Sequence, residues 1–301
     1  MRRRRVGTVG VLLVALAAAA CSAPVGRTEV TGMTTTAPEP SSGSGPSATP
    51  ATATGSPTSP VPTAPTARSE PSLVGDTENA WAFAPLDDPA AVTVEGTVPR
   101  QRAWSTSKVL VAAAYLEDVA DGDPDRLDDR QRRLVERALG ESDMDSLLAI
   151  RAAIGGDRGA AMTAILRSIG DAETVAPATR EGTMPWSVRE QVRFMAALAS
   201  GDVVSPATSA YLLAVMQPVE SQRWGLARVG ATAAKGGWLT PTTETRQMGI
   251  LDGYAVAVIT DAVGPAVLQS DGDEAHVEQM DRLAAMLAER LTPAAGASAA
   301  S

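Results

Sequence analysis

The sequence predicts a mixed α+β domain, in which helices flank both faces of an antiparallel sheet and a helical subdomain is inserted in the middle. Two short apolar runs near residue 90, separated by a turn, are typical of strands. A long helical block follows them, and three further strands and a final helix close the chain. Strands on either side of a helical block fit one sheet with an insertion.

The elements follow one another at boundaries that turn and breaker residues mark. Strands are expected at residues 81–86 and 91–96, with Asp87-Asp88-Pro89 as the turn between them. A helix from Ser105 to Val119 comes next, and Asp121-Gly122-Asp123-Pro124 ends it. The other elements of the helical block are expected at residues 126–139, 145–154, 159–169, 188–200 and 206–216. The closing elements are strands at residues 231–239, 245–251 and 254–260 and an amphipathic helix at residues 274–291.

The first 20 residues are typical of a signal peptide. Arg2 to Arg5 form a basic start, and residues 6–20 are apolar but too short to span a bilayer comfortably. Cys21, the only cysteine of the chain, follows directly. The segment resembles a bacterial lipoprotein signal, which implies that Cys21 is lipidated and that the protein is exported and anchored to the outer face of the cell membrane. The alternative is a plain secretion signal beside an unrelated cysteine.

Composition divides the rest of the chain into a linker, one domain and a tail. Residues 21–72 are rich in Pro, Ser and Thr and have almost no large apolar side chains. They cannot bury enough surface to offset chain entropy, so we expect a disordered linker after the lipidated cysteine. Residues 73–291 are long enough for one well-cored domain. Residues 292–301 are again small and polar, and we expect a disordered tail.

The charge balance argues against nucleic-acid binding, and the scarcity of cysteine and histidine argues against a metal site. Loss of residues 1–20 leaves 22 basic against 35 acidic side chains, about −13, which argues against nucleic-acid binding. With Cys21 committed to lipid, no disulfide or cysteine-ligated metal site is available in the domain. The single histidine, His276, lies in a helical stretch and is expected to be solvated. We expect no metal and no cofactor, and a monomer.

The chain has only two lysines, Lys108 and Lys235, against 24 arginines. Lysine can give up its proton near neutral pH, whereas arginine cannot. Lys108 follows Ser105 by three residues at a predicted helix start, so the two side chains share a face and a neutral lysine can activate the serine as a nucleophile. The helix dipole and partial burial both favour that neutral form. The alternative is that coding bias left two lysines at arbitrary positions.

Four segments together resemble the serine β-lactamase and penicillin-binding protein superfamily, in particular its class A β-lactamase-like branch. Trp104-Ser105-Thr106-Ser107-Lys108 resembles the nucleophile helix, and Ser142-Asp143-Met144 resembles the S-D-N element. Gly182-Thr183-Met184-Pro185 is similar to the start of the helix after the omega loop, and Lys235-Gly236-Gly237 stands where the family has K-T-G. The resemblance implies a β-lactamase/transpeptidase-like fold.

The resemblance also implies a role for each matching residue. Ser105 would be the acylated nucleophile, with Lys108 as its base and Ser142 as the proton relay to the leaving nitrogen. Lys235 would hold the substrate carboxylate. The backbone amides of Ser105 and Trp238 would form the oxyanion hole. The implied substrates are β-lactams and peptidoglycan peptides of the D-Ala-D-Ala type, bound at Trp104, Gly236, Gly237 and Trp238.

Departures from the family motifs leave two functions open. Met144 replaces an asparagine, and Gly236 replaces a threonine or serine. The segment that corresponds to the family's omega loop, Asp171 to Thr183, is short, and Glu173 and Glu181 are poor substitutes for the glutamate that activates water in the family. One function is a serine acyl hydrolase that is poor at deacylation. The other is a catalytically degenerate lipoprotein that binds cell-wall peptide or a partner protein.

Ser142 has two interpretations of its own. As the family's relay serine it would lie beside Lys108 and Lys235. As an ordinary helix cap it would instead accept from the first turn of the helix expected near Asp145.

Overall fold

The computed structural model describes residues 71–238, 244–261 and 275–292. The predicted signal peptide, Cys21 and nearly all of the linker and tail lie outside these ranges, so the structure bears on the predicted domain alone. Within the described ranges, no helix is both long and apolar enough to cross a membrane.

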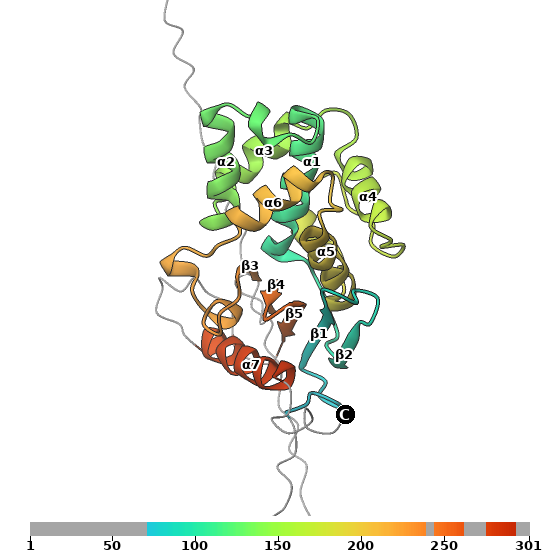
Figure 1. The fold of residues 1–301 in the computed structure, drawn as a ribbon, viewed down its shortest axis with the longest axis vertical. Coiled ribbons are helices and arrows are strands. Elements are labelled where there is room, and N and C mark those ends of the chain that lie inside the picture. The colour runs from blue at the N-terminus through green and yellow to red at the C-terminus, as the bar shows by residue number, and fades with distance from the viewer. Residues whose placement is uncertain (1–70, 239–243, 262–274, 293–301) are drawn as a thin grey trace, which may run out of the picture. The chain divides into compact units, whose positions relative to one another are not determined.

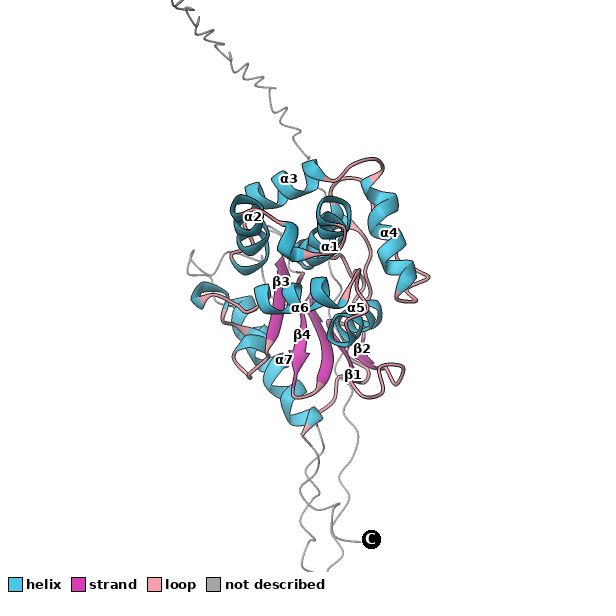
Figure 2. Cartoon of the chain, turned by 45° about the horizontal axis from the view of Figure 1, so that its top comes forward, coloured by secondary structure: helices cyan, strands magenta, loops and turns pink. Residues whose placement is uncertain are grey.

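Five strands form an antiparallel sheet in the spatial order β2-β1-β5-β4-β3 (Figures 1 and 2). They are β1 (Asn79–Pro85), β2 (Thr93–Gly96), β3 (Ala233–Trp238), β4 (Thr245–Leu251) and β5 (Tyr254–Thr260). β1 pairs directly with β5, so that Trp81 lies opposite Val258. Both ends of the domain therefore build one sheet, and β3 lies at its edge.

Helices cover both faces of this sheet, as the sequence predicts. They are α1 (Ser107–Ala120), α2 (Asp129–Gly140), α3 (Met144–Ala153), α4 (Arg158–Ser168), α5 (Val188–Ser200), α6 (Pro206–Val215) and α7 (Ala275–Leu291). Side chains alternate along each strand, so Ala257 of β5 joins the core shared with α1 and α5 while Val258 packs with α7. The α+β fold class is confirmed.

Local capping residues explain where the helices begin. Asp128 and Gln131 form a reciprocal capping box at the start of α2. Asp157, Ser187 and Ser205 accept hydrogen bonds from the first-turn amides of α4, α5 and α6. These short polar residues recur before apolar stretches, which is why most predicted helix boundaries agree with the structure to within a few residues.

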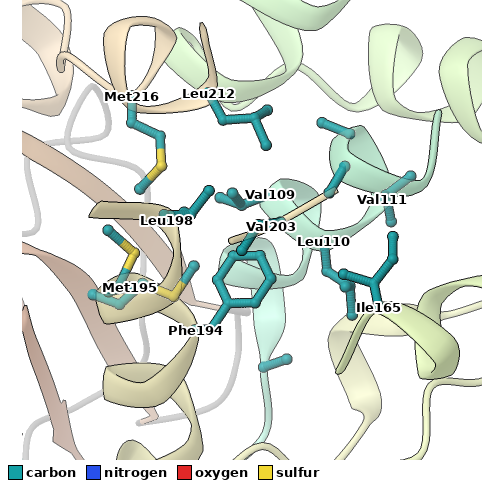
Figure 3. Close-up of a cluster of buried hydrophobic side chains, with 14 of the residues drawn as sticks. Val109, Leu110, Val111, Ile165, Phe194, Met195, Leu198, Val203, Leu212 and Met216 are labelled. Atoms are coloured by element: carbon teal, nitrogen blue, oxygen red, sulfur yellow. The ribbon is translucent and has the colours of Figure 1, made fainter. Parts of the chain in front are cut away.

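The α1 helix is buried on nearly all sides within the larger core. Val109, Leu110 and Val111 of α1 pack among Phe194 of α5 and Leu212 of α6 (Figure 3). Each of these five side chains is inaccessible to solvent. A helix surrounded in this way is held by close packing, so the residues at its N-terminus are placed rigidly.

The structure corrects two details of the sequence analysis. The predicted helix at Ser105 begins as a separate 3₁₀ turn, Trp104–Thr106, and the α-helix starts at Ser107. His276 is buried rather than solvated, and its Nδ1 lies 3.1 Å from the Thr245 hydroxyl. It belongs to the packing between α7 and β4, on the sheet face opposite to α1.

Candidate active site

The turn that carries Ser105 is backbone-strained and precedes the buried helix α1. Trp104 has a φ of 44°, in the left-handed region that bulky residues rarely adopt. The Ser107 hydroxyl donates to the Trp104 carbonyl at 2.7 Å, which ties the turn to the first residue of α1. Ser105 itself is half-buried, so this residue lies at the boundary between the core and solvent.

Lys108 is buried one turn along from Ser105. Its Nζ donates to both the carbonyl and the hydroxyl of Ser142, the latter at 3.1 Å. Burial lowers the pKa of Lys108 to about 8, although the negative charge of Asp143 opposes the shift. An appreciable fraction of Lys108 is therefore a neutral amine near neutral pH, as a general base requires.

Ser142 lies between the two lysines rather than capping a helix. Asp143 caps α3 by accepting from the Ser146 amide at 2.8 Å, so the interpretation of Ser142 as the cap is wrong. The Ser142 hydroxyl also accepts from Lys235 Nζ at 3.0 Å. A hydroxyl oxygen has two lone pairs and one proton, so Ser142 can accept from both lysines and still donate outward.

Lys235 is held in the β3 edge strand, almost completely buried. Its Nζ donates to Ser142 and, at 2.9 Å, to the Gly236 carbonyl. Burial, followed by the positive charge of Lys108, sets the pKa of Lys235 well below its usual value. The charge of Lys108 thus opposes the protonation of Lys235, and the two amines are joined by the shared Ser142 hydroxyl.

Gly237 allows β3 to approach the nucleophile turn closely. A Cβ at Gly237 would lie 2.8 Å from the Ser105 amide nitrogen and 3.0 Å from that of Thr106. Only glycine permits this separation. The close approach sets the backbone of β3, which continues into Trp238, against the turn that carries Ser105.

Gly236 is a glycine for a different reason. A Cβ there would lie 2.8 Å from Cζ2 of Trp224, so the indole fills the space that a threonine side chain would need. Trp224 also meets Trp238 edge-to-face, with ring centroids 5.6 Å apart. The packing of Trp224 against β3 therefore excludes the threonine or serine hydroxyl that the K-T-G motif has at this position.

The other predicted binding residues differ in exposure. Trp238 is half-buried, whereas Trp104 is 5% exposed and has Arg102 over its ring at 5.4 Å. Trp104 is therefore packed inside the domain and offers little surface to a ligand. Met144, in place of the family asparagine, is 54% exposed and therefore replaces a polar contact with an apolar side chain in solvent.

The two glutamates of the short omega-loop segment are not free to activate water. Glu181 is buried and bound to Arg151 at 3.2 Å. Glu173 is exposed in the turn that follows α4, where its amide donates to Asp171. Across the described ranges, no three His, Cys, Asp or Glu side chains gather into a metal site.

The structure also brings together buried polar residues that the sequence analysis missed: Gln191, Glu244 and Arg246. All three are 2% exposed or less, and they contact the turn around Ser105. Arginine and glutamine are common on surfaces, so their sequence context carries no signal of burial.

Solved structures resemble this chain over most of the domain. PBP-A matches with a TM-score of 0.54 and 19% identity, over 72% of this chain and 90% of that protein. The chromosome-encoded β-lactamase of Vibrio parahaemolyticus matches with a TM-score of 0.54 and 19% identity, over 72% of this chain and 94% of that protein. A β-lactamase from Xanthomonas campestris matches with a TM-score of 0.54 and 17% identity, over 72% of this chain and 91% of that protein.

A further similar structure is a PBP-A variant in an acyl-enzyme complex with penicillin G, with a TM-score of 0.52 and 19% identity, over 70% of this chain and 89% of that protein. No protein-family model and no curated protein sequence matches the chain. At these identities the likeness establishes the fold. The chain has the fold of the serine β-lactamases and penicillin-binding proteins, the superfamily that its motifs resemble.

Proposed function

We propose that the chain is an exported, membrane-anchored serine acyl hydrolase. It forms an acyl-enzyme on Ser105 with β-lactams or with peptidoglycan peptides of the D-Ala-D-Ala type, and it deacylates poorly. The observation that carries this proposal is the pair of buried lysines that share the Ser142 hydroxyl, one of them a single turn from Ser105. Burying two amines is costly, and proton transfer is a function that requires it.

Acylation begins with Lys108. Its neutral amine takes the proton of the Ser105 hydroxyl as the oxygen attacks the carbonyl carbon of the substrate. The backbone amides of Ser105 and Trp238 donate to the oxygen that becomes negative. The close approach of Gly237 to the Ser105 amide supports this part of the proposal, because it brings β3 beside the nucleophile.

Collapse of the tetrahedral intermediate breaks the carbon–nitrogen bond. Ser142 donates its proton to the leaving nitrogen and recovers one from the ammonium group of Lys108 or Lys235. The hydrogen bonds of both lysines to the Ser142 oxygen support this relay. Lys235 also attracts a substrate carboxylate, whose negative charge would favour its ammonium form.

Deacylation is the weak step. Hydrolysis of the ester needs a water molecule and a second base. Glu181 is engaged by Arg151 and Glu173 is exposed beyond α4, so the short omega-loop segment supplies neither as that base. Losing a general base typically slows a step about 10²- to 10⁴-fold, so we expect the acyl-enzyme to persist.

The second candidate function is a binding module with the same fold and no turnover. Met144 and Gly236 favour it, because both lack a polar group that would orient a ligand, and Gly236 is fixed by Trp224. In this case the surface around Ser105 and β3 holds a cell-wall peptide or a partner protein without reacting.

Location at the membrane is a separate part of the proposal. The basic and apolar start of the chain, followed by Cys21, supports export and lipid anchoring at the outer face. A linker of about 50 residues has a root-mean-square span of roughly 40 Å, enough to hold the domain away from the bilayer.

The experiment that separates the two candidate functions is covalent labelling. The purified chain is incubated with a reporter penicillin, and its intact mass and tryptic peptides are measured, with Ser105→Ala as the control. A single adduct on the peptide that contains Ser105, absent from the control, supports the acyl hydrolase. A folded protein without an adduct at any concentration supports the binding module.

A further inference from the structure

We propose that Arg246 is a positioning residue that acts through Gln191 and Thr106 to hold the Ser105 turn against the sheet. The inference rests on the proposed function, because it names what sets the geometry of that reaction. None of these residues touches the substrate in this proposal. Their action is on the backbone that presents the nucleophile.

The first observation is the burial of Arg246. Its side chain is 0% exposed, and burial lowers its pKa to about 9, with the negative charge of Glu244 opposing the shift. Removing a guanidinium from water is expensive, and an apolar side chain would often be more stable there. A buried arginine is therefore better explained by the specific geometry that its donors impose than by stability.

The second observation is the set of acceptors that Arg246 reaches. Its Nη1 donates to the Arg102 carbonyl, and its Nη2 donates to the Trp186 carbonyl at 3.0 Å and to Gln191 Oε1 at 2.7 Å. Arg102 precedes the Ser105 turn, Trp186 precedes α5, and Gln191 lies in α5 itself. One planar group on β4 thus fixes three segments relative to the sheet.

The third observation is the continuation of this chain of hydrogen bonds beyond Arg246. Gln191 Nε2 donates to the Thr106 hydroxyl at 2.7 Å, and that hydroxyl donates to the Ala103 carbonyl. The network therefore holds the residues on both sides of Ser105. Gln191 and Thr106 each accept from the preceding residue of the network and donate to the next one, an arrangement in which hydrogen bonds strengthen one another.

Glu244, which directly precedes β4, makes a further contact with the same segment. Its Oε1 accepts from the Arg102 amide at 2.6 Å, so Glu244 and Arg246 together hold both the N–H and the C=O of Arg102. Trp104, two residues later, adopts its left-handed conformation, which typically costs about 1–3 kcal/mol and persists only when surrounding contacts impose it. The Arg246 network and Glu244 provide these contacts.

The consequence is a fixed relation between the nucleophile and the oxyanion hole. Gly237 lies opposite Arg246 across the β3–β4 pair, and Trp238 follows it. The same arginine therefore ties the Ser105 turn to the strand pair that supplies the second amide. Displacing a reacting group by about 1 Å can cost about 100-fold in rate.

The test compares three threonine variants by penicillin acylation, separating the first-order acylation rate constant from the binding constant. Thr106→Val removes the hydroxyl and keeps the shape, Thr106→Ser restores the hydroxyl, and Thr163→Val is the matched control. The Thr163 hydroxyl accepts from the Ala176 amide at 3.0 Å, so Thr163→Val also removes one side-chain hydrogen bond, but does so on α4. We expect Thr106→Val to lower the rate constant about 10- to 100-fold with similar binding. Thr106→Ser and Thr163→Val should stay close to wild type.

Three results would overturn the inference: wild-type acylation by Thr106→Val, no recovery in Thr106→Ser, or an equal loss in Thr163→Val. If Thr106→Val does not fold, Gln191→Glu keeps the acceptor for Arg246 and removes the donor to Thr106, and it should give the same loss. If the wild type forms no adduct, the proposed function fails while hydrogen exchange of residues 102–107 still tests the network. Faster exchange in Thr106→Val than in Thr106→Ser is expected, and equal exchange contradicts it.

Discussion

Lys108 and Lys235 donate to the same oxygen, the hydroxyl of Ser142, at 3.1 and 3.0 Å. Burial lowers the pKa of both amines, and the positive charge of Lys108 lowers the pKa of Lys235 further. The arrangement spans 127 positions of sequence yet joins one helix start, one loop and one edge strand. It is the feature from which the proposed chemistry follows, and it makes specific pH and mutation experiments possible.

The rate of acylation should rise with pH through the pKa of Lys108. Because that pKa is about 8, the neutral fraction grows tenfold per pH unit below it and levels off above it. Intact-mass measurements on samples quenched at successive times, at about pH 6 to 9.5, would give the acylation rate constant as a function of pH. Lys108→Arg should abolish acylation, because arginine keeps its proton. An arginine variant that acylates at the wild-type rate would remove Lys108 from the mechanism.

Lys235→Arg should be milder than Lys108→Arg if Lys235 mainly supplies charge. Arginine retains a positive donor near Ser142 and an attraction for a substrate carboxylate, although the tight burial of Lys235 adds a packing cost. The comparison needs only the same acylation assay on both variants. Equal abolition in two folded proteins would instead give Lys235 a required role in proton transfer.

Burial of Lys108 should make the fold less stable at neutral pH than at high pH. The folded pKa is about 8 against the usual value of 10.5, so the penalty is absent above pH 10.5, grows as the pH falls from 10.5 towards 8, and is complete below pH 8. Its full size is about 3 kcal/mol at 1.36 kcal/mol per pKa unit. Denaturant unfolding should therefore show that the difference in free energy of unfolding between the wild type and Lys108→Met narrows as the pH rises from 8 to 10. A constant difference would show that the lysine is not desolvated.

Gly236 cannot regain the hydroxyl of the K-T-G motif without a cost in stability. Gly236→Ala should lower the free energy of unfolding by about 1–3 kcal/mol, because its Cβ meets the Trp224 ring. Gly140→Ala is the matched control, since its Cβ would meet nothing nearer than 3.9 Å. Trp224→Leu combined with Gly236→Ala should recover part of the loss in a double-mutant cycle. Additive losses would mean that the indole does not occupy this space.

The order and type of the elements could be predicted from the sequence because the signals are local. Asp128, Asp157 and Ser187 stand at helix starts, and Asp252-Gly253 makes the β4–β5 turn. Such residues act over a few positions, so no tertiary information is needed to interpret them.

The candidate site could be predicted only in part. The spacing of Ser105 and Lys108 is local, but the position of Ser142 between two lysines depends on contacts 34 and 93 residues apart. Arg246 gave no signal, because one arginine among 24 does not show that it is buried. The contact between Gly236 and Trp224 likewise depends on packing and not on sequence spacing.

Anchoring can be tested independently of the domain. Cys21→Ser should convert a protein of the membrane fraction into a soluble exported one, because the lipid attachment site is removed while the apolar signal remains. Fractionation with mass analysis of the N-terminal peptide would record both outcomes. A wild-type protein that is already soluble with a free thiol at Cys21 would rule out the lipid anchor.

The lifetime of a penicillin adduct on Ser105 is the sharpest test of whether the chain acylates and then deacylates slowly. The purified chain is labelled at high ligand concentration, free ligand is removed, and the intact mass is followed over time, with Ser105→Ala in parallel. We predict a slowly formed single adduct that persists for minutes or longer, because the base that would clear it is missing from the omega-loop segment. Rapid multiple turnover of a chromogenic cephalosporin would contradict slow deacylation, and no adduct on the folded wild type would contradict acylation of Ser105.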